Sequence, residues 1–267
     1  MPLGDYEKNV LRLLAANRNA ESYVAGATVF LRREDSHRQS QDIDLFHDTL
    51  QSLNQAAARD AALLEQSGYV LEWVENQETL RRATVSKGGR STRLDWAYDS
   101  AFRFFPVQPD SELGFVLHPL DGATNKLLAL AGRGELRDYL DVLFLHGNVL
   151  SLGALAWAAC GKDIGFTPQF LIEESQRLAH FPAVRLNSLL LRQSVDMVER
   201  KRLWLSAVAA ANNLFLKLPP EEIGCLYLDA GGQAVTPDPS GPGFASLRRH
   251  FGSVGGTTPV AASRISL

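Results

Sequence analysis

The spacing of apolar and polar residues divides the chain into an N-terminal part of mixed pattern and a helical C-terminal part. Up to about residue 147, short strand-like runs are interleaved with segments of helical period. Strands are predicted at 23–25, 42–46, 69–74, 80–85, 92–97 and 116–118, and helices at 5–20, 50–67, 121–130 and 135–145. This alternation predicts an α/β (α+β) module.

From residue 150 onward the helical period dominates. Helices are predicted at 151–162, 167–180 and 184–217, followed by a strand at 223–228 and a short helix at 244–251. The stretch 252–267 has few large apolar residues, so we expect part of it to be loosely ordered. A chain of 267 residues can hold a catalytic-size domain and a smaller appended one. The expected parts are an α/β domain over 1–147, a helical domain over 148–222, and a strand and tail extension over 223–267.

Composition is typical of a soluble globular protein, with 45% hydrophobic residues, 21% charged residues and a net charge of −3. No apolar run reaches the roughly 18 residues of a membrane span, and the start of the sequence lacks a signal-peptide pattern. The two cysteines, Cys160 and Cys225, have no metal-ligand spacing. These features predict a cytoplasmic protein without membrane association, disulfides or structural zinc.

One segment is strongly basic despite the acidic total. Six basic residues against two acidic ones lie between Leu80 and Phe104: Arg81, Arg82, Lys87, Arg90, Arg93 and Arg103, with Asp95 and Asp99. The segment is either a surface for polyphosphate or a solvated hairpin face.

Two carboxylates stand two positions apart in an apolar run, within Arg38-Gln39-Ser40-Gln41-Asp42-Ile43-Asp44. If the strand continues to Phe46, Asp42 and Asp44 project from one face, roughly 7 Å apart along the strand, while Ile43 points into the core. A divalent cation pair would relieve their repulsion, and such a pair serves in-line phosphoryl transfer.

Other residues agree with this interpretation. Gly26, at the end of a predicted buried strand, opens a turn with Ala27 and Thr28 whose N–H groups can bind phosphate. Asp95 alternates with apolar neighbours on its strand and would be a third carboxylate, for metal or for the acceptor proton.

Two short helical motifs supply further charged groups. Asn125-Lys126 is expected to begin one helix, and Lys126 would neutralise a triphosphate. Asp138 on the next helix is a further acidic candidate. Asp141 is interpreted as half of a plain surface pair with Arg137, four residues away.

The order of these motifs resembles the AbiEii/MenT-like nucleotidyltransferases, members of the polymerase-β-like superfamily that include toxins of toxin–antitoxin systems. The resemblance covers roughly residues 20–147 and rests on four motifs: Gly-Ala-Thr, Arg-x-Ser-x-Asp-Ile-Asp-Leu-Phe, Leu-Asp-Trp, and Asn-Lys-Leu-Leu-Ala-Leu with Arg-Asp-Tyr-Leu-Asp. It implies a mixed sheet with flanking helices, followed by a mostly helical module, with 1–147 as the catalytic domain.

The resemblance also implies a role for each residue. Asp42, Asp44 and Asp95 would bind Mg²⁺ or Mn²⁺, and Lys126 and Asp138 would complete the catalytic set. The nucleotide would be bound by the following residues: Gly26, Ala27, Thr28, Arg38, Ser40 and Lys126. Ala27 departs from the family's second Gly or Ser, which removes a hydroxyl but keeps the backbone donors.

The expected activity is metal-dependent transfer of a nucleoside monophosphate from an NTP to an acceptor hydroxyl. The resemblance implies that the acceptor is the 3′ end of a tRNA and that a cognate antitoxin is a partner. Two alternatives stay open: a small-molecule acceptor, as in antibiotic-modifying enzymes, and a catalytically silent binding protein on the same fold. A metal phosphohydrolase is disfavoured because His37, His47 and His118 lack ligand spacing.

Overall fold

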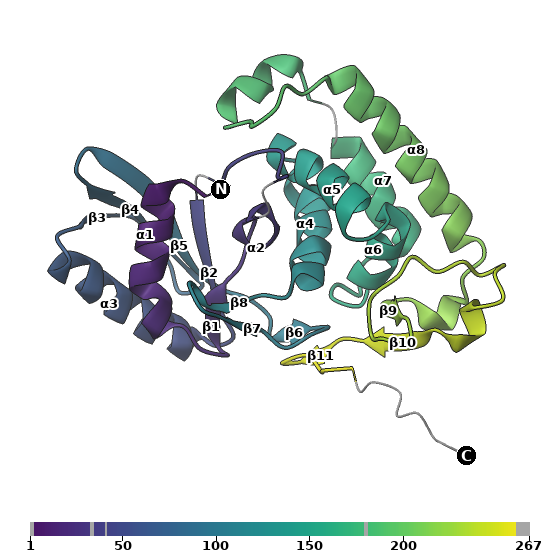
Figure 1. The fold of residues 1–267 in the computed structure, drawn as a ribbon, viewed down its shortest axis with the longest axis horizontal. Helices are drawn as coiled ribbons and strands as arrows, with labels where there is room; N and C mark the ends of the chain where they lie inside the picture. Colours follow the sequence, from purple (N-terminus) through teal and green to yellow (C-terminus); the bar gives the residue numbers. More distant parts are fainter. Residues whose placement is uncertain (1–2, 33–34, 41, 179–180, 260–267) are drawn as a thin grey trace. The chain divides into compact units, whose positions relative to one another are not determined.

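The computed structural model describes residues 3–32, 35–40, 42–178 and 181–259, and it forms two compact units (Figure 1). Unit 1 comprises Met1–Ala101, Pro106–Gly122 and Leu189–Gln193, and unit 2 comprises Phe102–Phe105, Ala123–Ser188 and Ser194–Leu267. Gln41 of the acidic motif and residues 260–267 of the predicted tail lie outside the described residues, as do 179–180 at the end of a predicted helix.

Unit 1 is built on a seven-stranded mixed sheet with the strand order β3-β4-β5-β2-β1-β8-β7. Its strands are β1 (Ser22–Val24), β2 (Asp42–His47), β3 (Val70–Asn76), β4 (Leu80–Lys87), β5 (Arg90–Tyr98), β7 (Gln108–Asp110) and β8 (Gly114–Val116). β2 lies at the centre, antiparallel to β1 and parallel to β5. The predicted α/β fold with a mixed sheet is therefore confirmed.

The alternating pattern of β2 gives its two sides opposite characters. Ile43, Leu45 and His47 are buried, and the residues between them are only half-buried. Across the parallel register, Ile43 pairs with Leu94 and Leu45 with Trp96, so this side of the β2–β5 pair is apolar at these positions. That side packs against α1 (Asp5–Leu14) and α3 (Leu50–Gln66) (Figure 1). The other side carries the acidic residues of β2.

A buried ion pair joins α3 to the rest of unit 1. Arg18 and Asp60 have side chains 1% and 0% exposed, with Arg18 Nη2 2.5 Å from Asp60 Oδ2. The same carboxylate accepts hydrogen bonds from Asn17 Nδ2 at 2.8 Å and Trp96 Nε1 at 2.8 Å. Because the charge is fully enclosed, these donors are what makes it tolerable in the core.

A short segment from late in the sequence completes unit 1. The backbone N–H of Gln39 donates to Leu190 O at 2.8 Å, and that of Arg192 donates to His37 O at 3.0 Å. Arg38 and Leu191 form an isolated antiparallel bridge. The residues just before β2 thus obtain backbone partners from a segment of Leu189–Gln193.

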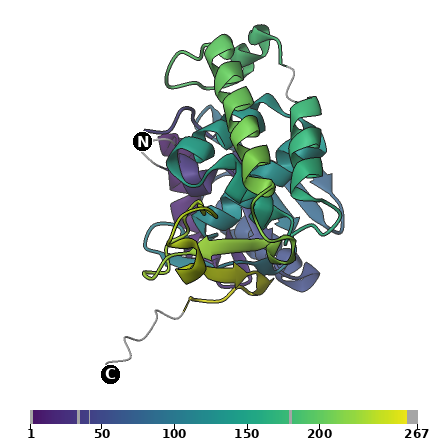
Figure 2. The same cartoon turned by 90° about the vertical axis from the view of Figure 1, so that its right-hand side faces the viewer.

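Unit 2 is mostly helical, with two small two-stranded sheets. Its helices are α5 (Leu136–Asn148), α6 (Leu152–Ala159), α7 (Pro168–Leu178) and α8 (Met197–Phe215), together with most of α4 (Pro119–Arg133). α8 packs along α5, α6 and α7 (Figures 1 and 2). β9 (Cys225–Leu228) pairs with β10 (Arg248–Phe251), and β6 (Phe102–Arg103) pairs with β11 (Ser253–Val254). Shorter pieces complete the two units: α2 (Thr28–Leu31) and the 3-10 turns η1 (Ala15–Asn17), η2 (Ala183–Ser188), η3 (Pro220–Glu222) and η4 (Phe244–Ser246).

Two predicted elements and one predicted helix start are wrong. The helix expected at 184–217 is a 3-10 turn at Ala183–Ser188, an irregular link and then α8, which starts where the Asp196 carboxylate caps the N–H groups of Val198 and Glu199. The helix expected at 244–251 is a 3-10 turn followed by strand β10, paired with β9. Lys126 lies within α4, which begins at Pro119, a residue suited to a first helical turn.

In the part of the chain that the structure describes, no single helix is both long and apolar enough to cross a membrane. Only α5 and α6 taken together, across a bend of 111°, reach that length and composition.

We expect Asp60→Ala to lower the free energy of unfolding by about 3–5 kcal/mol, because it leaves the buried Arg18 guanidinium without a counter-charge. Urea denaturation of the variant measures this loss. Asp5→Ala is the control: the Asp5 side chain is 88% exposed and 3.7 Å from Lys8, so its loss should change stability by less than about 0.5 kcal/mol. Equal effects of the two variants would contradict the role given to the buried pair.

Candidate active site

The polar side of the sheet brings the three predicted carboxylates together. The even-numbered residues of β2 face this side, so Asp42 and Asp44 project from it together. In the parallel register with β5, Asp44 lies beside Asp95 and Asp42 beside Arg93. The sequence predicted the shared face of the first two residues, and the strand pairing adds the third.

The neighbouring strands β4 and β3 extend this polar row. Arg82 on β4 pairs in register with Asp95, and Glu75 on β3 pairs with Arg82. Across the four strands the row therefore reads Glu75, Arg82, Asp95, Asp44, in which a guanidinium separates the first two carboxylates.

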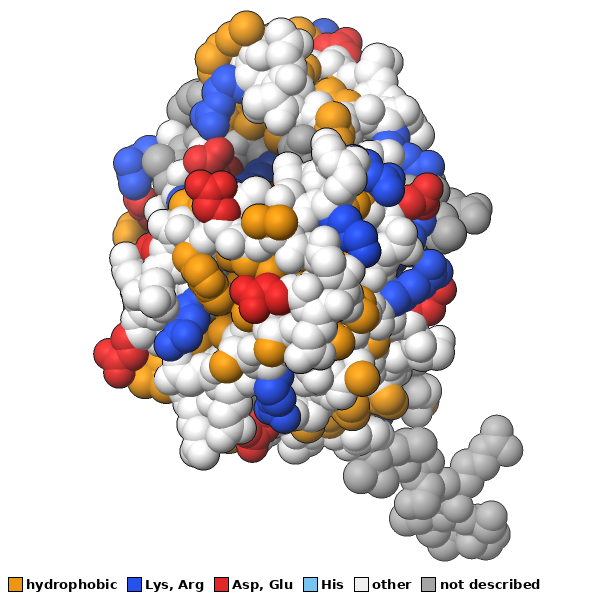
Figure 3. Space-filling model, turned by 90° about the vertical axis from the view of Figure 1, so that its left-hand side faces the viewer, with side chains coloured by type: hydrophobic (Ala, Val, Ile, Leu, Met, Phe, Trp, Pro, Cys, Tyr) orange, Lys and Arg blue, Asp and Glu red, His pale blue; other side chains and the backbone are white. Residues whose placement is uncertain are grey.

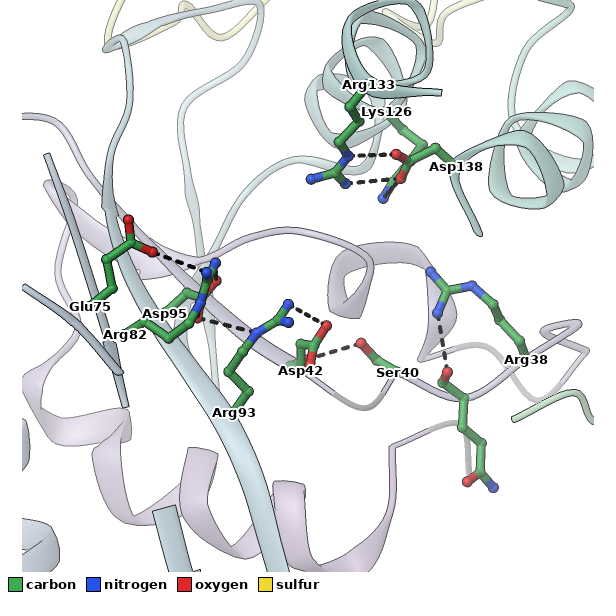
Figure 4. A network of polar contacts seen from close by, with 11 residues as sticks. Arg38, Ser40, Asp42, Glu75, Arg82, Arg93, Asp95, Lys126, Arg133 and Asp138 are labelled. Carbon is green, nitrogen blue, oxygen red and sulfur yellow. Dashed lines mark hydrogen bonds and ion pairs between the residues drawn. The ribbon is translucent and has the colours of Figure 1, made fainter. Parts of the chain in front are cut away.

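Two arginines contact the carboxylates directly (Figure 4). Arg82 binds Asp95 through two hydrogen bonds, Nε to Oδ1 at 2.8 Å and Nη2 to Oδ2 at 2.6 Å, and its Nη1 donates to Glu75 Oε2 at 3.1 Å. Arg93 Nη2 donates to Asp42 Oδ2 at 2.5 Å, and its Nε is 3.4 Å from Asp95 Oδ1. The hydrogen bond to Asp95 raises the pKa of Arg82 above its ordinary value.

The predicted phosphate turn lies against Asp44. Gly26 has φ +61°, a conformation that favours glycine, and a Cβ at this position would lie 1.8 Å from Asp44 Oδ2. The N–H of Ala25 donates to the backbone oxygen of Asp44 at 2.9 Å. Glycine is therefore required here both for the backbone conformation and for the close approach of the turn to the carboxylate.

The other predicted nucleotide-binding residues are mostly buried. Ala27 caps the four-residue helix α2, and Thr28 begins it with a fully buried hydroxyl that has no hydrogen-bond partner among the described residues. Ser40 donates from Oγ to Asp42 O at 3.0 Å, which supports the start of β2. Arg38, 5% exposed, donates from Nη1 to Gln39 O at 3.2 Å (Figure 4).

The chemistry of the donor set fits a hard divalent cation, because Asp42, Asp44 and Asp95 offer carboxylate oxygens from adjacent strand positions. Among the described residues, however, no three His, Cys, Asp or Glu side chains converge closely enough to hold a metal as they stand. The hydrogen bonds of Arg82 and Arg93 direct two of the three carboxylates elsewhere.

Lys126 and Asp138 form a second charged cluster, within unit 2 (Figure 4). Lys126 Nζ lies 2.8 Å from Asp138 Oδ1 and 3.3 Å from Asp141 Oδ2, and both carboxylates are fully buried. Arg133 binds Asp138 as well, with Nε 2.7 Å from Oδ2. Burial raises the pKa of Asp138, but Lys126 and Arg133 outweigh it, and the net result is a lowered pKa.

The interpretation of Asp141 as a plain surface residue is wrong. Its side chain is 0% exposed and forms an ion pair with Lys126, a helix away. Spacing within α5 suggested the partner Arg137, but the packing of α4 against α5 was not visible in the sequence. The Lys126 ammonium thus already has two carboxylate partners inside the protein.

Arg82, Arg93 and Arg133 were not predicted as members of these clusters. Arg82 and Arg93 were noticed only as part of the basic run. Two other members of that run also contact residues of unit 1: Arg81 Nη2 donates to Asn54 Oδ1 at 2.6 Å and Lys87 Nζ donates to Ser67 O at 2.6 Å. On the face shown in Figure 3, basic side chains are interspersed with acidic ones. The sequence did contain a signal: Arg93 and Asp95 are two residues apart on one strand, as are Arg82 and Thr84, so the members of each pair face the same side of the sheet.

Solved structures share this architecture at low sequence identity. JHP933 from Helicobacter pylori has a TM-score of 0.52 and 17% identity, over 80% of this chain and 95% of its own. A candidate nucleotidyltransferase from H. pylori has a TM-score of 0.50 and 18% identity, over 80% and 96%. MenT4, a nucleotidyltransferase toxin from Mycobacterium tuberculosis, has a TM-score of 0.56 and 14% identity, over 81% and 83%.

This is the nucleotidyltransferase fold. No protein-family model matches the chain, and no curated protein matches it in sequence. The resemblance to AbiEii/MenT-like nucleotidyltransferases is confirmed at the level of the fold, including the helical part that follows the sheet.

We expect Gly26→Ala to lower the free energy of unfolding by at least about 1 kcal/mol more than Gly88→Ala. Both glycines have positive φ, +61° and +60°, so both variants carry the same backbone strain. Only at Gly26 does the new methyl group meet another side chain, that of Asp44; at Gly88 nothing lies within 4 Å. Urea denaturation of both variants measures the difference, and equal losses would show that the turn does not press on Asp44.

We expect the acid sensitivity of folding to depend in part on Asp138. Its folded pKa is lower than the ordinary pKa of an aspartate, so the stability it contributes is complete above that ordinary value and is lost as the pH falls through the folded pKa. The difference in unfolding free energy between the native protein and Asp138→Asn should therefore shrink between about pH 5 and pH 3. Urea titrations across this range test it, and a constant difference would contradict the lowered pKa.

Proposed function

We propose that the protein is a metal-dependent nucleotidyltransferase that transfers a nucleoside monophosphate from an NTP to an acceptor hydroxyl. One observation carries the proposal: on this fold, Asp42, Asp44 and Asp95 share one side of two adjacent strands, with the Gly26 turn against Asp44. A turn that can bind phosphate next to clustered carboxylates is the arrangement that phosphoryl transfer requires.

In the proposed reaction the acceptor oxygen bonds to the α-phosphorus, the bond from that phosphorus to the β-bridging oxygen breaks, and pyrophosphate leaves. Asp42 and Asp44 would hold Mg²⁺ or Mn²⁺, which when bound supplies neutralisation of the triphosphate charge. Asp95 would orient the acceptor hydroxyl and accept its proton. Each Asp95 oxygen already accepts one hydrogen bond from Arg82 and keeps a second lone pair for the acceptor hydroxyl.

The turn at Gly26 and Ala27 would bind phosphate through its backbone N–H groups, and Arg38, Ser40 and Thr28 would border the nucleotide. Lys126 would contact the phosphates and Asp138 would hold Lys126 in place. Because Lys126 is 8% exposed and paired with two carboxylates, a phosphate would have to share its ammonium with them.

For the acceptor, we favour the 3′ end of a tRNA, with a protein antitoxin as partner in the cytoplasm, following the motif resemblance and the likeness in fold to a nucleotidyltransferase toxin. A small-molecule acceptor is the second candidate. The observation in its favour is that Arg81, Arg82 and Arg93 of the basic run contact residues of their own unit, which leaves less of that run for a polyanion.

We expect the native protein with Mg²⁺ to transfer label from one of the four α-³²P-labelled NTPs into total tRNA. Asp42→Ala and Asp44→Ala should each lower the rate at least about a hundredfold, because each removes a carboxylate for the metal. The control is Asp5→Ala, which replaces an exposed aspartate outside the proposed site and should transfer label at the native rate. A native rate in Asp44→Ala would refute the proposed site.

The salt dependence of the reaction distinguishes the two acceptors. Transfer to tRNA should fall steeply as salt increases, because binding to RNA releases counterions, whereas transfer to a small neutral acceptor should not. Absence of label in RNA, with metal-dependent NTP binding retained, would favour the small-molecule acceptor. Absence of both would favour a catalytically silent binding protein.

A further inference from the structure

The arginines among the three carboxylates differ in how firmly they are held. Arg82 is fixed at both ends, by two hydrogen bonds to Asp95 and one to Glu75. Arg93 has one close hydrogen bond, to Asp42, and its Nε, 3.4 Å from Asp95 Oδ1, has no hydrogen-bond partner among the described residues. Arg93 is also the more exposed side chain, at 35% against 27% for Arg82. Moving the Arg93 side chain away from the carboxylates therefore costs less free energy than moving that of Arg82.

The position of Arg93 conflicts with a metal at the same carboxylates. Its Nη2 uses an Asp42 oxygen, and its guanidinium places a positive charge between Asp42 and Asp95. A divalent cation at Asp42 would meet both an engaged ligand and a repulsive charge. Without any cation, however, Asp42, Asp44 and Asp95 would repel one another across the adjacent strands.

We propose that Arg93 is an exchangeable counter-cation: it stabilises the carboxylates until a divalent metal binds, is displaced from Asp42 by that metal, and then presents its guanidinium to the phosphates of the incoming nucleotide. Arg82 stays in place and orients Asp95. The inference rests on the proposed function, since it concerns the same carboxylates.

The exchange links metal binding to nucleotide binding. A metal that binds alone must break the hydrogen bond between Arg93 and Asp42, so its affinity is reduced. With an NTP present, the displaced guanidinium gains a bidentate phosphate partner, which offsets that loss. The two ligands therefore strengthen each other's binding, by the same factor in both directions.

The test is a titration of the full-length protein with Mn²⁺ in the absence of nucleotide, with free Mn²⁺ measured by electron paramagnetic resonance. Arg93→Gln should bind Mn²⁺ about tenfold more tightly than the native protein, because the competing charge is gone. Arg90→Gln is the matched control: it lies on the same strand, but its guanidinium stacks over the Tyr6 ring at 5.3 Å, and its removal should leave the affinity unchanged.

A second measurement separates displacement from a simple charge effect. In protein labelled with ¹⁵N-arginine, the Nε–H resonance that is missing in Arg93→Gln identifies Arg93. Saturation with Mg²⁺ should shift this resonance while that of Arg82 stays in place. An unmoved Arg93 resonance, or an Mn²⁺ affinity that is not raised in Arg93→Gln, would overturn the exchange.

Failure of this inference and failure of the proposed function give different results. If the native protein binds Mn²⁺ and Asp42→Asn/Asp44→Asn does not, but Arg93→Gln binds like the native protein, only the role of Arg93 is refuted. If neither the native protein nor Arg93→Gln binds Mn²⁺, the metal site is refuted together with the exchange.

Discussion

The parallel pairing of β2 with β5 is the contact on which the candidate active site depends. Its register is fixed by the buried side, where Ile43 lies beside Leu94 and Leu45 beside Trp96. A shift by one residue would exchange the two sides of the strand and put carboxylates into the core. The apolar packing on α1 and α3 therefore determines which polar residues meet on the opposite side.

That polar side is stable only because its charges are balanced. Carboxylates on adjacent strands repel one another, and unit 1 places guanidinium groups among them at short distances. The arginines come from the same strands as the acidic residues or from the next one, so the register that gathers the negative charge also supplies the positive charge. Binding of a cationic ligand would replace one of these internal partners.

Features that depend on residues close together in the sequence could be predicted, whereas contacts between residues far apart in the sequence could not. The shared face of Asp42 and Asp44 follows from strand geometry, and the turn at Gly26 follows from a glycine after a buried strand, so both could be predicted locally. The pairing of Lys126 with Asp141 depends on how two helices pack, and no spacing within one helix encodes it. The prediction of one long helix at 184–217 was wrong because apolar spacing does not reveal that residues 190–192 form backbone hydrogen bonds with a segment far away in the sequence.

The segment Leu189–Gln193 has a consequence for synthesis of the protein. Arg192 Nη1 donates to Ser36 Oγ across 156 residues of sequence, and neighbouring backbone groups pair alongside it. The stretch that leads into the acidic strand therefore stays without this partner on the ribosome until the chain has grown past residue 192. The protein would therefore complete the approach to β2 late in translation, and a fragment ending at residue 147 would lack these backbone partners of residues 37–39.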